Sequence, residues 1–176
     1  MNRGGVSDLL FTIRPATVAD VPVIFELIRG LAEYERAPDA VTCDETRLRE
    51  SLFPMTGRPD AEVLIAEAGA TAAGFAVFFH NYSTWWGRRG IYLEDLFVRP
   101  ELRGRGIGKG LLRSLARIAR DRECARLEWA VLDWNTPAID FYKSLGAVPL
   151  DEWTIFRLNR PEIEKLAGDL ATNEHE

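Results

Sequence analysis

The segment from Arg103 to Gly110 constrains the fold of this chain more than any other. It reads RGRGIGKG, with a glycine at every second position. An apolar run, 91–98, precedes it and an amphipathic run, 111–119, follows it. The first run predicts a strand and the second predicts a helix. The chain therefore passes from strand to helix through glycines, which allow backbone conformations and close approaches that a Cβ would block.

A turn of this kind at the start of a helix is suited to binding an anion. The first amides of a helix have no partner within it, and the helix dipole favours negative charge there. Arg103, Arg105 and Lys109 add positive charge. A pyrophosphate is the ligand that fits these features, and a plain structural turn is the alternative.

The spacing of the glycines excludes two common phosphate loops. A dinucleotide fingerprint needs glycine where Leu111 stands, and a nucleoside triphosphate loop needs Ser or Thr where Gly110 stands. The pattern that remains is R-x-x-G-x-G, filled by Arg103, Gly106 and Gly108.

The order of elements along the chain predicts the fold class. Capping-box pairs, Thr17 with Asp20 and Thr42 with Glu45, open the first two helices. The sequence predicts strands at 11–14, 63–66, 74–79, 91–98, 127–132 and 153–158, and helices at 21–34, through 48–52, after 110 and at 137–145. This order predicts an α/β fold with a mixed sheet.

Length and composition narrow the class of protein. The 176 residues suit one domain, 11–168, with loose ends at 1–10 and 169–176. The net charge of −5 argues against a nucleic-acid partner. No apolar run is long enough to span a membrane and no signal peptide is visible, so we expect a cytoplasmic protein. Cys43 and Cys124 lack metal-ligand spacing, which predicts buried thiols and no metal site.

Five further motifs accompany the glycine turn, and together they carry a family resemblance. They are IRPAT at 13–17, LAEYE at 31–35, YLED at 92–95, AVLDWN at 130–135, and FYK with LGA at 141–147. With R-x-x-G-x-G they make residues 11–167 resemble the GCN5-related N-acetyltransferase (GNAT) superfamily, and within it the spermidine/spermine and thialysine N-acetyltransferases. The resemblance implies the GNAT fold, in which helices flank a mixed, mostly antiparallel central sheet. It also implies a homodimer that acetylates a primary amine of a small cationic molecule with acetyl-CoA.

The resemblance assigns the residues that bind acetyl-CoA. It implies that the turn wraps the coenzyme pyrophosphate, and that a backbone N–H on the preceding strand polarises the thioester carbonyl. Asn135 is expected to contact the coenzyme, although it also suits the position of a helix N-cap before Thr136 and Pro137. The expected coenzyme-binding residues are Leu96, Phe97, Val98, Arg103, Gly104, Arg105, Gly106, Ile107, Gly108, Lys109, Asn135 and Tyr142.

Acetyl transfer to an amine requires two proton movements, and the resemblance assigns a residue to each. An alkylammonium with a pKa near ~10.4 must lose a proton, and the coenzyme thiolate must gain one. Glu94 is expected to accept the first, to anchor the ammonium, or both, and Tyr142 to donate the second. Strand alternation would turn Glu94 and Asp95 to opposite faces, and without the resemblance Glu94 would be a surface acid and Tyr142 a core residue. No motif contains a cysteine, so we expect direct transfer in a ternary complex rather than a covalent relay.

The acceptor is expected to meet acids and aromatic rings, namely Tyr34, Glu35, Trp85, Glu94 and Asp95. The polyamine acetylators of the subfamily that this chain resembles tend to have an acid shortly before the loop tryptophan. Here the loop lacks an acid and two arginines follow Trp86, so the resemblance favours a lysine-like or diamine acceptor over spermine. Whether Trp85 or Trp86 faces the acceptor stays open. Two other function classes remain: a non-catalytic acyl-CoA sensor, and an acetyltransferase acting on proteins or peptides.

Overall fold

A computed structural model describes residues 10–171, with the backbone alone for 169–171. The expected loose ends therefore lie, apart from Leu10 and 169–171, outside the described residues. Contacts divide the chain into two compact units, residues 1–130 and 131–176, and each is described by itself.

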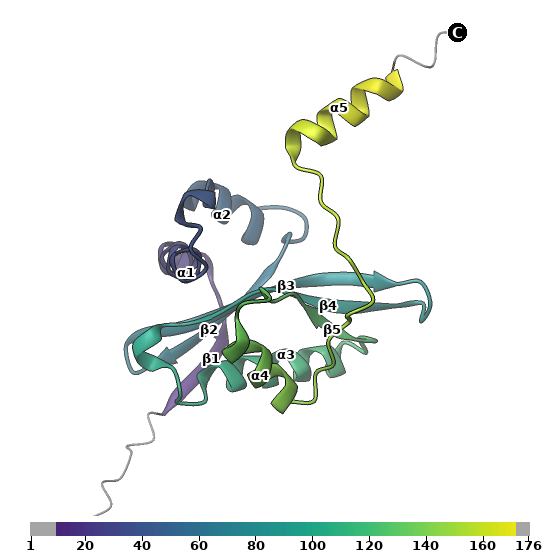
Figure 1. Cartoon of the computed structure of the whole chain (residues 1–176). Helices are drawn as coiled ribbons and strands as arrows, with labels where there is room; N and C mark the ends of the chain where they lie inside the picture. Colours follow the sequence, from purple (N-terminus) through teal and green to yellow (C-terminus); the bar gives the residue numbers. More distant parts are fainter. Residues whose placement is uncertain (1–9, 172–176) are drawn as a thin grey trace, which may run out of the picture. The chain divides into compact units, whose positions relative to one another are not determined.

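The first unit is built on a five-stranded sheet with the order β1-β2-β3-β4-β5 (Figure 1). The strands are β1 (Phe11–Pro15), β2 (Glu62–Ala68), β3 (Thr71–Ser83), β4 (Arg88–Val98) and β5 (Leu127–Trp129). The first four pair antiparallel and β5 pairs parallel to β4. The prediction of a mixed, mostly antiparallel sheet is confirmed.

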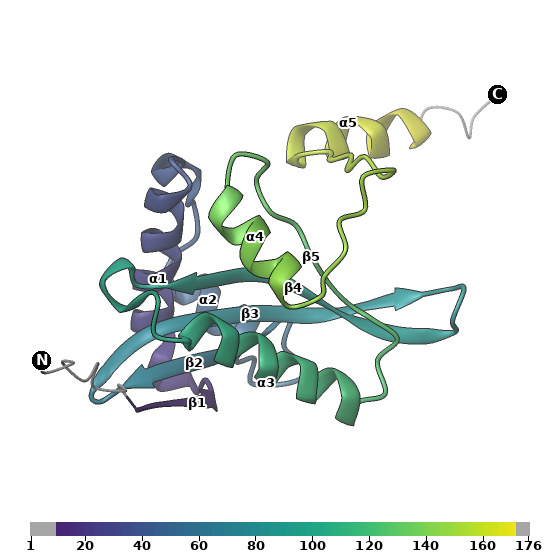
Figure 2. The ribbon, with the colours of Figure 1, turned by 60° about the horizontal axis from the view of Figure 1, so that its bottom comes forward.

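Helices cover both faces of this sheet. The helices α1 (Val21–Tyr34) and α2 (Glu45–Leu52) lie on one face, and α3 (Ile107–Asp121) crosses the other (Figures 1 and 2). Short 3-10 turns at 18–20, 38–40 and 100–102 precede α1, α2 and the glycine turn. The α3 helix buries one apolar stripe, Ile107, Leu111, Leu112 and Leu115.

The central strands are buried on both sides because both faces carry helices. In β2 the consecutive residues 63–66 are all buried, and in β3 so are residues 73–78. Strands covered on two faces read as continuous apolar runs rather than as alternating patterns. Below α1 and α2 the core is formed by Ile24, Leu27, Leu52, Val63, Ile65, Phe75, Val77 and Phe97.

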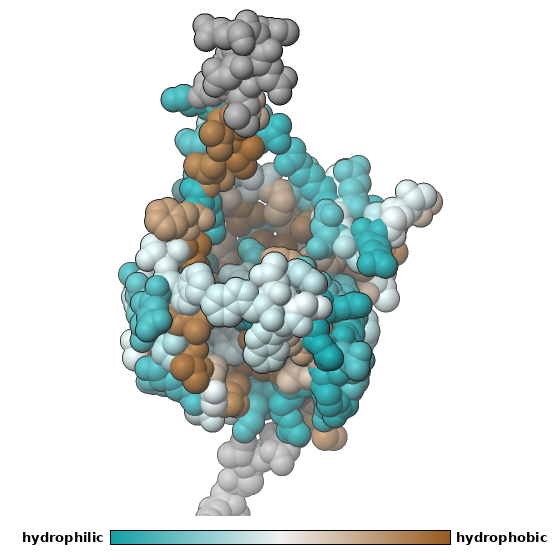
Figure 3. Space-filling model, turned by 90° about the vertical axis from the view of Figure 1, so that its right-hand side faces the viewer, coloured by the Kyte–Doolittle hydropathy of each residue, from teal (hydrophilic) through white to brown (hydrophobic). Residues whose placement is uncertain are grey.

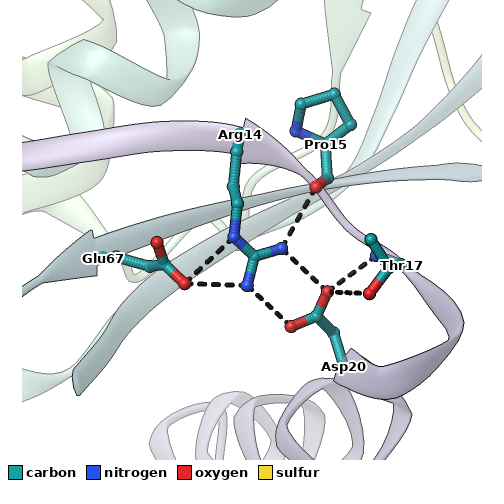
Figure 4. Close-up of polar contacts among 5 residues, drawn as sticks. All are labelled: Arg14, Pro15, Thr17, Asp20 and Glu67. Atoms are coloured by element: carbon teal, nitrogen blue, oxygen red, sulfur yellow. Dashed lines mark hydrogen bonds and ion pairs between the residues drawn. The ribbon is translucent and has the colours of Figure 1, made fainter. Parts of the chain in front are cut away.

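A polar network fixes the passage from β1 into α1 (Figure 4). The Arg14 guanidinium donates to both oxygens of Asp20 at 2.8 Å and to Glu67 of β2 at 2.7 Å. The Asp20 carboxylate also accepts from the backbone N–H of Thr17 at 2.7 Å. The capping box predicted for Thr17 and Asp20 is therefore present, and it is tied to the sheet.

The second helix starts differently from the prediction. Asp44, not Thr42, is the N-cap of α2, and its Oδ1 accepts from the backbone N–H of Arg47 at 2.8 Å. Both residue types cap helices, and the helix begins two residues later than the box at Thr42 would place it. Cys43, next to this cap, and Cys124 are free thiols that are partly exposed, so the prediction that they are buried is wrong.

The second unit contains two helices, α4 (Thr136–Ser144) and α5 (Arg160–Ala171). The helix predicted at 137–145 is confirmed, whereas α5 was missed. The predicted strand at 153–158 is wrong, since the described residues there form no strand and Ile155 and Phe156 are exposed. The strand predicted at 127–132 ends at Trp129.

Among residues 10–171, none of the helices has the length and apolar character needed to cross a membrane.

Candidate functional site

Two glycines of the glycine turn have left-handed backbone, which glycine adopts without strain. Gly104 and Gly106 have φ values of 74° and 81°, in the left-handed region that favours glycine. Gly106 is the N-cap of α3 and supplies no capping side chain. The first amides of α3 consequently point out of the helix end with no side chain of the N-cap to accept from them.

The other two glycines of the turn, Gly108 and Gly110, differ in the space that surrounds them. A Cβ on Gly110 would lie 2.7 Å from the Phe11 ring, so this glycine allows α3 to pack against β1. A Cβ on Gly108 would meet only Val98 Cγ2, at the ordinary distance of 3.8 Å. The packing of the described residues therefore does not require glycine at 108, and a ligand that approaches the helix end closely would require it. The turn fits the pyrophosphate of a coenzyme on this observation.

The side chains of the turn point in different directions. Ile107 is buried in the core, so only its backbone can contact a ligand, whereas Arg105 and Lys109 are exposed. The Arg103 guanidinium lies over the Tyr34 ring, 4.3 Å from its centroid, and its Nε donates to the Val98 carbonyl at 3.0 Å. Arg103 thus uses its side chain within the protein.

A β-bulge in β4 lies at Glu94. Val77 of β3 faces Asp95, and the next residue, Phe78, faces Leu93. Glu94 is therefore an extra residue with no partner on β3, and the strict alternation expected of Glu94 and Asp95 does not hold. Bulges turn side chains away from the regular strand pattern, and here the turned side chains are carboxylates.

Beyond the bulge, β4 separates from β5. The pairing of these strands ends at Leu93 with Trp129, and among the described residues no strand pairs with 94–98 on that side. The main chain of Leu96, Phe97 and Val98 remains paired to β3 on its other side. An open strand edge leads directly from the bulge to the glycine turn. Its backbone groups are suited to bind a thioester carbonyl.

Three acids gather around the bulge. Burial, together with the negative charges of Glu94 and Glu35, raises the pKa of Asp95 to about 6. Burial also raises the pKa of Glu35, which follows the last residue of α1. Glu94 is exposed. The three carboxyl groups repel one another when they are ionised. A bound cation would relieve this repulsion.

Trp85 lies far from these acids along the strand. Trp85 and Trp86 are in the turn at 84–87 that closes the β3–β4 hairpin, and they are 89% and 67% exposed. From Arg88 to Glu94 the chain advances by roughly 20 Å. We call residues 82–89 the hairpin arm, and Figure 3 views the molecule from this side.

Asn135 and Tyr142 belong to the second unit. Asn135 is the N-cap of α4, where its carbonyl accepts from the amides of Ala138 and Ile139 at 3.0 Å, while its buried side chain makes no capping bond. Tyr142 is half-buried on α4, with its ring 5.4 Å from that of Phe141. Their roles toward the coenzyme stay predictions.

The acceptor and coenzyme residues predicted on the first unit thus lie at the bulge with the end of α1, along the edge 96–98, in the glycine turn and on the hairpin arm. The bulge brings Glu35, Glu94 and Asp95 together. Arg103, the first residue of the glycine turn, stacks on Tyr34, which precedes Glu35, and Trp85 lies on the hairpin arm. Sequence reasoning missed the bulge and the Arg103 contact, and no local signal could have revealed either, since both depend on the pairing of distant segments.

The chain is similar in sequence to known acetyltransferases. The family model described as Acetyltransferase (GNAT) family matches residues 26–147. The chain is 42% identical to the thialysine N-epsilon-acetyltransferase of Bos taurus, over 89% of this chain and 96% of that protein. It is 30% identical to the L-ornithine N5-acetyltransferase NATA1 of Arabidopsis thaliana, over 88% of this chain and 86% of the relative.

Solved structures agree at the level of the fold. An integron cassette protein from the mobile metagenome of V. cholerae superposes with a TM-score of 0.72 at 27% identity, covering 89% of this chain and 97% of the other. An aminoglycoside acetyltransferase from a soil metagenome has a TM-score of 0.73 at 17% identity, covering 88% and 99%, which supports the fold alone.

Proposed function

This chain belongs to the acetyltransferase (GNAT) family, and we propose that it transfers the acetyl group of acetyl-CoA to the primary amine of a lysine- or ornithine-like amino acid or a diamine. It is an N-acetyltransferase of the thialysine kind. The relatives that support this acceptor class are named for thialysine and for L-ornithine, two amino acids with an amine at the end of the side chain.

One observation carries the proposal: a single strand leads from an acid cluster toward a helix end that has no capping side chain and is suited to an anion. The bulge at Glu94 and Asp95 is followed by the open edge 96–98 and then by the turn at 103–108. A cationic amine held at the bulge and a pyrophosphate held at the turn would lie at opposite ends of that edge, where a thioester carbonyl could accept a hydrogen bond from a backbone amide.

A carboxylate at the bulge accepts the first proton, which comes from the acceptor ammonium. The acceptor ammonium must lose a proton before its nitrogen can form the new C–N bond. A carboxylate of the cluster binds the ammonium and takes this proton, directly or through water. Glu94 remains our candidate for this step. The raised pKa of Asp95 makes it a second carboxyl able to hold a proton near neutral pH.

Tyr142 is our candidate for the second proton movement. Acetyl-CoA supplies the acyl group as a thioester, and breaking the C–S bond leaves a thiolate that needs a proton. A phenol can supply that proton because its pKa, near ~10, is not far above that of a thiol, near ~8.5.

Direct transfer in a ternary complex agrees with the positions of the first unit's groups. Cys124 precedes Ala125, whose amide donates to the Arg89 carbonyl at 2.8 Å, and β4 advances by roughly 17 Å from Arg89 to Glu94. A cysteine at that distance could not carry the acyl group between the two substrates.

The hairpin arm supports the proposal that the protein is a homodimer. Trp85 and Trp86 are exposed at its tip, and Arg88 and Arg89 beside them are exposed as well. This aromatic and cationic tip lies too far from the acids of its own chain to share an acceptor pocket with them. Its chemistry complements the acid cluster of a second copy, which would bring Trp85 to the acceptor across the interface.

An amine panel tests the proposed function. Purified protein is incubated with acetyl-CoA and with thialysine, lysine, ornithine, diamines, spermine or a lysine-containing peptide, and free thiol release is followed. We expect the highest kcat/KM among the amino acids and short diamines. Binding of acetyl-CoA without turnover of any amine would support a sensor instead, and preference for the peptide would support a protein acetyltransferase.

A further inference from the structure

The first residue of the glycine turn is fastened to the end of α1. The Arg103 guanidinium carbon lies 4.3 Å from the centre of the Tyr34 ring and 5.7 Å from that of Phe97. Its Nε donates to the backbone carbonyl of Val98 at 3.0 Å. A planar guanidinium can stack on a ring and donate sideways at the same time, which an ammonium cannot do.

The two rings beneath Arg103 are close in sequence to the acids of the cluster. Tyr34 is the last residue of α1 and precedes Glu35 of the acid cluster. Phe97 is buried two residues after Asp95 and packs under α1, where a Cβ on Gly30 would lie 3.1 Å from its ring. The turn that would hold the pyrophosphate and the segment that would hold the amine therefore share one contact.

The end of α1 has two different sides. A groove of about 440 Å³ runs along one face of α1 from Pro22 to Glu33 and is bordered by Phe97 and Arg99. On the other side, Leu31 and Tyr34 pack against the core. The Arg103 stack adds to this packing at the Tyr34 ring, and Glu35 is the next residue.

We propose that Arg103 is a positioning residue which couples acetyl-CoA binding at the glycine turn to amine binding at the end of α1. A pyrophosphate bound at the turn would fix Arg103 in place and, through its stack on Tyr34, hold Glu35 beside the bulge. The coupling is reciprocal, so a bound amine also tightens acetyl-CoA binding. This inference rests on the proposed function.

Steady-state kinetics and acetyl-CoA titration test the coupling. Arg103→Lys keeps the positive charge but loses the planar stack and the Nε bond. We expect it to raise the KM for the amine about fivefold, as the loss of a cation–π contact would, with the Kd of acetyl-CoA without amine changed less than twofold. Tyr34→Leu removes the ring and should match Arg103→Lys. Arg117→Lys, at an exposed arginine of α3, is the matched control and should behave as wild type.

The double variant Arg103→Lys/Tyr34→Leu separates coupling from independent effects. If the contact is the coupling, the double variant has the same KM as either single variant, because the second change removes nothing further. Multiplied effects would overturn the proposal. A loss confined to acetyl-CoA affinity in Arg103→Lys would also overturn it, since Arg103 would then be a plain phosphate contact.

Hydrogen exchange provides a readout that does not depend on turnover. The amides of Glu35, Arg36 and Ala37 donate to carbonyls in the last turn of α1 at 2.9–3.1 Å. Acetyl-CoA should slow their exchange in wild type and not in Arg103→Lys. Equal protection in both proteins would overturn the coupling. A different result would be a wild-type protein that binds acetyl-CoA and protects these amides but acetylates no amine. That result would refute the proposed function without contradicting the effect of acetyl-CoA on the end of α1.

Discussion

At the scale of single residues, the four glycines of the turn do different work. Gly104 and Gly106 provide left-handed backbone, Gly110 allows α3 to approach β1, and Gly108 meets only an ordinary contact. The fold therefore requires glycine at 104, 106 and 110, whereas at 108 a ligand would require it. Alanine substitutions can distinguish these two requirements.

Gly108→Ala and Gly110→Ala form a matched pair. We expect Gly108→Ala to keep the Tm of wild type and to weaken acetyl-CoA binding about tenfold, because its methyl group enters the space of the pyrophosphate. Gly110→Ala should instead lower stability by roughly 1–3 kcal/mol, since its Cβ would overlap the Phe11 ring. Thermal unfolding and isothermal titration measure both. A destabilised Gly108→Ala with normal affinity would contradict the assignment.

Asp95→Asn should make the folded protein more stable at alkaline pH. The pKa of Asp95 is about 6 in the folded protein and 3.8 without the fold. The folded state therefore holds the extra proton between these pH values, and stability falls as the pH rises from about 4 to about 6. At pH 8 we expect Asp95→Asn to unfold at higher urea, by on the order of 2 kcal/mol, and the gain to vanish at pH 4.

The same variant should lose activity toward cations. We expect kcat/KM for the amine to fall at least about tenfold, because one carboxylate of the cluster is gone. Glu50→Gln, on the exposed surface of α2, is the control for removing one negative charge. Wild-type kinetics in Asp95→Asn would exclude Asp95 from the acceptor site.

Tyr142→Phe tests the proton donor. Removing the phenol oxygen should lower kcat by about 10²-fold or more, with little change in the Kd of acetyl-CoA. Pre-steady-state kinetics would show whether the chemical step slows. An equal loss of turnover and affinity would mean that Tyr142 shapes the coenzyme site and donates no proton.

At the scale of elements, the start of α1 depends on a carboxylate that reaches back to the sheet. The Arg14 guanidinium and the Thr17 amide hold the pKa of Asp20 well below its usual range. The α1 helix is therefore joined to β1 and β2 at its first turn, and the Arg103 contact holds its other end. An arginine of β1 thus holds the first turn of α1, and an arginine of the glycine turn holds its last residue.

Asp20→Asn should destabilise the protein at neutral pH. A carboxyl whose pKa is lowered by folding contributes stability above its unfolded pKa, near 4, and loses it as the pH falls. We expect a loss of roughly 1–3 kcal/mol at pH 7 by urea unfolding. The gap between the two proteins should narrow from pH 4 toward pH 2. A constant gap across that range would mean that shape, not charge, explains the effect.

At the scale of the whole molecule, the hairpin arm is the strongest indication of a second copy. It presents two exposed tryptophans with no acid near them in sequence, about 20 Å along the strand from the acid cluster. Large aromatic side chains are frequent at the centres of interfaces. The acceptor site proposed here would be complete only in a dimer.

Trp85→Ala and Trp86→Ala identify which ring takes part. Light scattering after size exclusion should give a dimer for wild type and at least a tenfold weaker dimer for the double variant. The single variant that also raises the KM for the amine marks the ring at the acceptor. A monomeric wild type with full activity would refute the composite site.

Local sequence features determined much of this protein on their own. The turn at 103–110 was predictable because positive φ and unpaired helix amides are properties of a few consecutive residues, and α1 because its apolar stripe and cap are local. The α5 helix also left a local signal, Pro161 in the first turn with Ile163 and Leu166 three residues apart, which could have predicted it.

Only the tertiary structure decided the rest, because each remaining feature needs two segments that are distant along the chain. The bulge at Glu94 exists only through the register of β4 on β3, and it decides where the acids point. The stack of Arg103 on Tyr34 needs the end of α1 to meet the end of β4. The strand predicted at 153–158 failed for the same reason. An apolar run becomes a strand only when another strand offers its backbone hydrogen bonds, and the local sequence does not show whether one does.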